Sequence, residues 1–202
     1  NHLSARRVKK NDVVTFFSGK GDVVIATLVS IDKKQAIFYA NPADYRFEQA
    51  KDKVTLVFGI TKMPALEFVL QKASELGVDQ IILLHCKNTP IAFSPKIFSK
   101  KHERFQKIII SACEQSGRYL LPALSYQTYS DYITSRKDRK KFIFHPVGGE
   151  RLSQKLLSYP CDLMIGPEGG WSEEELTLSG ATKCLLTDTV LRADTASIAA
   201  IL

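Results

Sequence analysis

Short runs of apolar and β-branched residues, broken by polar and glycine-containing segments, occupy the first fifty positions, a pattern typical of β-strands. Strands are predicted at Val13–Phe17, 23–31 and Ala36–Tyr39. The first two flank Ser-Gly-Lys-Gly-Asp at 18–22, a composition that favours a hairpin turn. Apolar and polar residues alternate poorly over 23–29, so we expect this strand to be buried on both faces of a small β-barrel.

From residue 54 onward, apolar runs of strand length alternate with segments of helical spacing. Apolar residues three and four apart from Leu66 to Leu76 predict a helix ended by Gly77. A similar stripe from Phe105 to Cys113 predicts a second helix that ends near 116–117. Further strands are predicted at 54–60, 80–86, 141–145, 162–165 and 184–187, and a last helix from residue 193. This alternation predicts an α/β fold whose mostly parallel sheet is covered on both faces.

The change of pattern predicts two domains, a β-barrel over 1–53 and an α/β domain over 54–202. The helical pattern of the last helix continues to the final residue, Leu202, so we expect this helix to be truncated. The chain also begins without Met, so we expect its natural start to lie further upstream.

The composition limits the class of protein but does not indicate a catalytic or metal site. The 202 residues are 45% hydrophobic, with a formal charge of +7 that suits a polyanionic partner such as RNA. The four cysteines are scattered and lie mostly in or beside apolar runs, which predicts buried, reduced thiols in a cytoplasmic protein. Neither they nor the four histidines show metal-ligand spacing, and no apolar run approaches membrane-spanning length.

The richest local signal is the sequence Gly-Pro-Glu-Gly-Gly at 166–170, which follows an apolar strand. Ser172 and Glu175 have the spacing of a capping box, so a helix should begin directly after the turn. A strand, a glycine-rich turn and a helix start can hold an anion or cofactor on free backbone N–H groups. The same pattern also suits a plain tight connection between strand and helix.

Three predicted strand ends carry unusual residues, namely His145-Pro146, 166–170 and 187–195. Parallel strands bring their carboxyl ends to one edge of a sheet, where ligands gather. We therefore expect one pocket built from three loops that are far apart in the sequence.

Four motifs in this order carry a family resemblance: Glu-Leu-Gly-Val at 75–78, Glu-Gln-x-x-Arg at 114–118, Gly-Pro-Glu-Gly-Gly at 166–170, and Leu-Arg-x-x-Thr-Ala at 191–196. The chain resembles the RsmE family, the 16S ribosomal RNA (uracil-N3)-methyltransferases of the SPOUT superfamily, over nearly its whole length. Each motif alone is weak, but the ordered set is specific.

The resemblance implies a SPOUT-type domain with a deep C-terminal trefoil knot, and an N-terminal PUA-like barrel that binds RNA and lacks its first strand here. It also implies a homodimer that uses S-adenosylmethionine (SAM) to methylate N3 of a uridine in the 16S rRNA of the 30S subunit. Neither a metal nor a membrane is implied.

On this resemblance the three loops hold the cofactor. The residues concerned are His145, Pro146, Ile165, Gly166, Pro167, Glu168, Gly169, Gly170, Leu186, Thr187, Val190, Leu191, Arg192, Thr195 and Ala196. Arg192 is the first catalytic candidate, since a guanidinium can hold a phosphate or uracil oxygens as negative charge develops. The alternative to a catalytic role for Arg192 is a structural ion pair with Asp194 or Glu168. Glu168 either fixes its own loop or acts as a base.

Six cations are candidates for RNA binding: Arg6, Arg7, Lys9, Lys10, Lys20 and Arg118. The five in the first domain form either a phosphate-binding surface or an ordinary solvated face. Arg118 either contacts RNA or binds the terminal carbonyls of its helix.

Two positions depart from the family pattern. Relatives usually carry Leu-Gly where this chain has Leu186-Thr187, and often Glu where it has Asp194. These departures support a second hypothesis, a catalytically inactive knotted RNA-binding protein. A third hypothesis, a phosphate-binding enzyme, is disfavoured because the chain lacks a G-x-x-x-x-G-K-[ST] motif.

Overall fold

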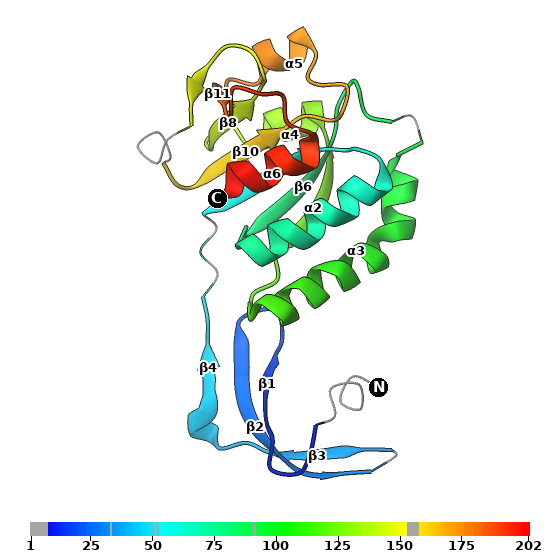
Figure 1. Cartoon of the computed structure of the whole chain (residues 1–202), viewed down its shortest axis with the longest axis vertical. Helices are drawn as coiled ribbons and strands as arrows, with labels where there is room; N and C mark the ends of the chain where they lie inside the picture. Colours follow the sequence, from blue (N-terminus) through cyan, green and yellow to red (C-terminus); the bar gives the residue numbers. More distant parts are fainter. Residues whose placement is uncertain (1–7, 33, 50, 52, 91, 153–157) are drawn as a thin grey trace. The chain divides into compact units, whose positions relative to one another are not determined.

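The chain divides into two units, residues Asn1–Ala50 and Lys51–Leu202. The structure, a computed structural model, describes residues 8–32, 34–49, 51, 53–90, 92–152 and 158–202. Figure 1 shows the first unit as blue and pale blue strands and the second as a sheet layered with helices.

The first unit is a four-stranded antiparallel sheet in which β2 pairs with each of the other strands. Its elements are β1 (Val13–Phe17), β2 (Asp22–Ile31), β3 (Ala36–Tyr39), the 3-10 turn η1 (Pro42–Asp44) and β4 (Tyr45–Phe47). The predicted hairpin between β1 and β2 is confirmed. The Ser18 amide donates to the Asp22 carbonyl at 3.0 Å, and the Ser18 hydroxyl donates to the Asp22 carboxylate at 2.8 Å.

Burial of β2 on both faces was a wrong prediction. Val23, Ala26 and Leu28 are buried, but Ile25, Val29 and Ile31 are each more than a third exposed. A β-bulge between Leu28 and Ser30 shifts the pairing register with β3. The bulge lies at the end of the stretch 23–29, so the sheet is half-exposed rather than covered on both faces, and the apolar residues Ile25 and Val29 lie on its exposed surface.

The second unit contains a seven-stranded sheet in which every recorded pairing is parallel, as predicted. The strand order is β7-β6-β5-β10-β8-β11-β9. The bounds are β5 (Val54–Gly59), β6 (Gln80–His85), β7 (Ala123–Thr128), β8 (Lys140–Phe144), β9 (Glu150–Arg151), β10 (Cys161–Ile165) and β11 (Thr182–Leu185). The strands β5 and β10 are almost wholly buried, which explains their continuous apolar sequences.

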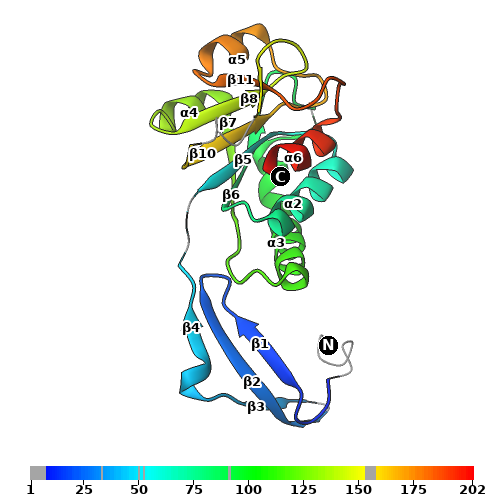
Figure 2. The same cartoon turned by 60° about the vertical axis from the view of Figure 1, so that its left-hand side comes forward.

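Helices cover both faces of this sheet, as Figures 1 and 2 show. One face carries α2 (Met63–Leu76), α3 (Pro95–Ser116) and α6 (Ala193–Ile201), and the other carries α4 (Tyr129–Ser135) and α5 (Glu173–Leu178). Successive strand residues point to opposite faces, so Leu56 and Phe58 join the first core while Val57 joins the second.

The predicted helix ends are confirmed. Gly77 and Gly117 follow α2 and α3 with φ of 97° and 73°, a left-handed conformation that glycine adopts without steric cost. Ser172 caps α5, and its capping box with Glu175 is formed in both directions. The structure therefore places a helix directly after the turn at 166–170.

Several elements escaped the sequence analysis, namely η1, β4, β7, α4 and β9, and one was displaced. The edge strand β7 is only half-buried and contains Ser, Gln and Thr, so it lacks an apolar run. The helix α4 is too short for a helical period to stand out. The strand β11 begins two residues earlier than predicted because its polar first residues, Thr182 and Lys183, conceal it. Leu186 and Thr187 consequently lie in a loop.

All four cysteines are buried. Burial raises the pKa of the Cys161 thiol to about 11, so this thiol is protonated at neutral pH. Among the described residues, no helix combines the length and the apolar character needed to cross a membrane.

Candidate functional site

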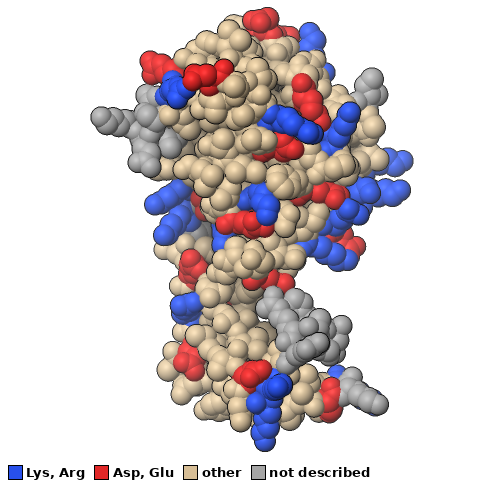
Figure 3. All heavy atoms as spheres, in the orientation of Figure 1, with Lys and Arg blue, Asp and Glu red and all other residues tan. Residues whose placement is uncertain are grey.

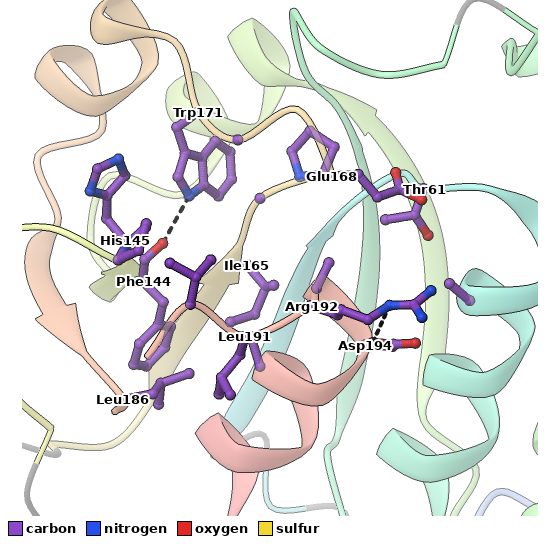
Figure 4. Close-up of a pocket in the computed structure, with 18 of the residues that line it drawn as sticks. Thr61, Phe144, His145, Ile165, Glu168, Trp171, Leu186, Leu191, Arg192 and Asp194 are labelled. Carbon is purple, nitrogen blue, oxygen red and sulfur yellow. Dashed lines mark hydrogen bonds and ion pairs between the residues drawn. The ribbon is translucent and has the colours of Figure 1, made fainter. Parts of the chain in front are cut away.

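The three predicted loops meet at one cavity of about 410 Å³ at the carboxyl edge of the sheet. They follow β8, β10 and β11, and the starts of α2 and α6 complete the wall (Figure 4). A cavity of this size falls within the range of small-molecule and cofactor sites.

Thirteen of the fifteen residues predicted to hold a cofactor line this cavity. They are His145, Pro146, Ile165, Gly166, Pro167, Glu168, Gly170, Leu186, Thr187, Val190, Leu191, Arg192 and Ala196. Gly169 and Thr195 do not. Gly169 lies against Asn88, while Thr195 is exposed in the first turn of α6. Thr61, Ala65, Phe144, Trp171 and Asp194 line the cavity without having been predicted as site residues.

The turn at 166–170 is held close to the neighbouring strand. A Cβ on Gly59, at the end of β5, would lie 2.6 Å from the Pro167 ring, so only glycine allows this approach. Gly170 has φ of 71°, and its amide donates to the Pro167 carbonyl at 2.8 Å. These constraints keep the loop that forms the cavity floor in one conformation.

The loop between β6 and α3 clamps the same turn from the other side. The Asn88 side-chain amide donates to the carbonyls of Gly169 at 2.9 Å and Gly170 at 3.1 Å. The Lys87 amide donates to the buried Glu175 carboxylate at 2.8 Å, and the same carboxylate accepts from the Ser172 amide. Sequence reasoning missed Asn88, because it follows β6, which is separated from β10 by β5.

One end of the cavity is apolar. Phe144, Ile165, Leu186 and Leu191 point into it (Figure 4), and the largely buried Trp171 lies beside them. The Trp171 indole donates to the Phe144 carbonyl at 3.2 Å, which fixes the ring against the loop. This end provides flat apolar surface of the kind that a purine ring contacts.

The other end is polar and contains both catalytic candidates (Figure 4). The Glu168 carboxylate accepts from the Lys62 amide at 3.2 Å and so caps α2 from outside the helix. This contact supports the structural alternative for Glu168. The Arg192 side chain is 85% exposed, and its Nε lies 3.9 Å from Asp194, so the ion pair predicted as its alternative is present only as a long contact.

The two departures from the family pattern both have local hydrogen bonds. The Thr187 hydroxyl donates to the Thr189 carbonyl at 2.7 Å, which organises the loop after β11. Asp194 accepts from the Thr195 amide at 2.8 Å, inside the first turn of α6. Both residues thus contribute to the local structure of the cavity wall.

The predicted RNA-binding cations are spread over the chain. Arg6 and Arg7 lie outside the described residues, while Lys9, Lys10 and Lys20 are exposed in the first unit. Arg118 is partly buried and donates to the carbonyls of Ser74 at 2.6 Å and Val78 at 3.1 Å. It therefore joins the end of α3 to the end of α2 and to the connection before β6, and it caps the neighbouring helix rather than its own.

No cluster of three or more His, Cys, Asp or Glu side chains suited to a metal occurs in the part of the chain that the structure describes.

An open parallel sheet with a cavity at its carboxyl edge defines an α/β protein that binds a nucleotide-like ligand. Residues 48–202 match the family model for the RNA methyltransferase domain. The chain belongs to this RNA methyltransferase family, and the predicted resemblance to the RsmE family is confirmed.

Individual relatives of this chain are also named as methyltransferases. Ribosomal RNA small subunit methyltransferase E of Buchnera aphidicola is 28% identical over 203 residues, which cover 96% of this chain and 79% of the relative. The crystal structure of the same enzyme from Neisseria gonorrhoeae, bound to SAM, is 30% identical with a TM-score of 0.84, covering 99% of this chain and 85% of that one. A putative methyltransferase from Legionella pneumophila, also with SAM, is 29% identical with a TM-score of 0.84, covering 98% and 84%.

Proposed function

We propose that this protein is a SAM-dependent methyltransferase that modifies N3 of a uridine in the 16S rRNA of the small ribosomal subunit. The observation that carries the proposal is the cavity at the sheet edge, with an apolar end and a polar end that contains an exposed arginine. The SAM-bound relatives support the choice of cofactor.

The residues present suit this cofactor. Leu186, Leu191 and Ile165 offer apolar surface to an adenine ring, and backbone groups of the glycine-rich turn lie within the same cavity. Bound SAM would supply an activated methyl group on a sulfonium, so the protein has to provide position and electrostatics. The clamped turn at 166–170 provides the preorganisation that this role requires.

Arg192 is proposed to stabilise the reacting base. Uracil N3 must give up its proton, to a base or to water, before it can take the methyl group, and until the N–C bond forms the negative charge is shared with the two neighbouring carbonyl oxygens. A guanidinium at the cavity mouth can donate hydrogen bonds to those oxygens or to the adjoining phosphate. Glu168 is proposed to hold the loop, because its carboxylate already accepts the Lys62 amide.

The remaining proposals concern architecture. The first unit is proposed to be a PUA-like RNA-binding barrel over 1–53, with its exposed Lys9, Lys10 and Lys20 toward RNA. A trefoil knot over the last part of the chain is proposed from the match to the RNA methyltransferase family. A cytoplasmic homodimer is proposed, and the exposed Phe68 and Leu76 on α2 offer apolar contact surface.

Mass mapping of methylated uridines tests the function. In cells that lack this protein, one N3-methylated uridine of 16S rRNA should be missing, and the purified protein with SAM should restore it. An unchanged methylation map, together with no transfer to small-subunit RNA in vitro, would refute the proposal.

A further inference from the structure

Four exposed lysines follow the carboxyl ends of β5 and β6 in the second unit. Lys62 follows β5, Lys87 follows β6, and Lys96 and Lys100 occupy the first turns of α3. We call these four residues the lysine rim. Figure 3 shows Lys and Arg side chains gathered on the flank of this unit where α3 lies.

The rim adjoins the cavity through contacts in the backbone. Thr61, directly before Lys62, lines the cavity, and the Lys62 amide bonds the cavity residue Glu168. Lys87 precedes Asn88, the side chain that clamps the turn at 166–170. If one base of an RNA strand occupied the cavity, the sugar–phosphate backbone next to that base would lie near the rim lysines.

The ammonium groups of the rim differ in their ion pairing from the cations further along α3. Two neighbouring carboxylates, Glu168 and Glu175, accept hydrogen bonds from backbone amides. Further along α3, by contrast, Arg104 pairs with Glu67 and Lys107 pairs with Glu103. Within the described ranges, no ion pair is recorded for the side chains of the four rim lysines. The rim lysines thus differ from these two cations in having no recorded carboxylate partner among the described residues, whereas Arg192 in the cavity itself has a long contact to Asp194.

We propose that the lysine rim binds the sugar–phosphate backbone of the RNA whose base enters the cavity. This inference rests on the proposed rRNA methylation and assigns it a second contact surface, separate from the lysines of the first unit. Ammonium groups are compact point charges that suit phosphate. The rim therefore contributes affinity without sequence preference.

The test compares two triple variants with the same loss of charge. The rim variant carries Lys87→Gln, Lys96→Gln and Lys100→Gln, and the control carries Lys53→Gln, Lys137→Gln and Lys140→Gln at the amino edge of the same sheet. Affinity for an unmodified 16S rRNA transcript is measured over a series of KCl concentrations. If each lysine neutralises one phosphate, the slope of log K against log[salt] falls by about 2 in the rim variant. Affinity near 0.15 M salt then drops by tens of fold.

The control should keep the slope of the unaltered protein, and Lys→Arg replacements at the three rim positions should restore it. Calorimetry should give the same SAM affinity for both variants. Equal slopes for the rim variant and the unaltered protein, or an equal drop in the control, would overturn the proposal. A complete lack of methyl transfer by the unaltered protein would instead defeat the proposed function, so the two failures are distinguishable.

Discussion

Arg192→Ala is expected to abolish methyl transfer, while SAM affinity stays within about tenfold, or ~1.4 kcal/mol, of the unaltered protein. The side chain is 85% exposed and held only by a 3.9 Å contact to Asp194, so its removal leaves the folded cavity intact. What is lost is the cation proposed to stabilise the uracil as N3 gives up its proton. Turnover with 16S rRNA and calorimetry with SAM measure the two effects separately.

Two variants control this experiment. Arg104→Ala removes an exposed arginine that pairs with Glu67 between α3 and α2, and it should leave turnover nearly unchanged. Asp194→Asn breaks the ion pair but keeps the guanidinium, so it should preserve most activity if Arg192 acts on the substrate. Near-normal turnover in Arg192→Ala would remove this residue from the mechanism.

Asp162→Asn is expected to destabilise the second unit by about 3–5 kcal/mol, the usual consequence of breaking a buried ion pair. Asp162 is fully buried, and its carboxylate accepts from Arg136 Nε at 2.8 Å, Arg139 Nε at 2.6 Å and the Tyr132 hydroxyl at 2.9 Å. Both guanidinium groups also donate to the Thr55 hydroxyl of β5. The amide would leave two largely buried cations without their counter-charge, and urea unfolding measures the loss.

The pH dependence of unfolding gives a second measurement. Burial raises the pKa of Asp162, but hydrogen bonds and the charge of Arg136 outweigh it and hold the pKa below its ordinary value. A carboxyl with a depressed pKa stabilises the fold above its unfolded pKa of about 3.9, and that stability is lost as the pH falls through the folded value. The unaltered protein should therefore lose stability in acid more steeply than Asp162→Asn.

The exposed Asp188, which pairs with Arg151, provides the control, and Asp188→Asn should leave the urea midpoint unchanged. A urea midpoint of Asp162→Asn similar to that of Asp188→Asn would contradict the assigned role of Asp162.

The two edges of the sheet differ in how readily the sequence reveals them. At the carboxyl edge, loops such as 166–170 follow apolar strands directly, so the topology of a parallel sheet was enough to predict that they meet. At the amino edge, Arg136 and Arg139 lie in a polar stretch with no period, and nothing local indicates that both reach a buried aspartate. Contacts of this kind depend on tertiary packing, which spacing along the chain does not encode.

Arg118 and Asn88 illustrate the same limit within the functional part of the molecule. The sequence placed Arg118 at the end of α3 but could not indicate which carbonyls its guanidinium would bind. One of these carbonyls belongs to Ser74 in α2, and the other belongs to Val78 in the segment that follows α2. Asn88 lies in a loop without a motif, and its two bonds to glycine carbonyls become visible only when β6 and β10 flank β5. Strand order therefore had to be known before the clamp could be recognised.

Titration with SAM, followed through the fluorescence of Trp171, tests the central claim most directly. Trp171 is the only tryptophan in the chain and lines the cavity, so its emission reports on this site alone. We predict a saturable change at equimolar SAM with the same dissociation constant as calorimetry. Calorimetric binding of SAM without any change in Trp171 emission would place the cofactor elsewhere, and no binding at all would favour the inactive RNA-binding alternative.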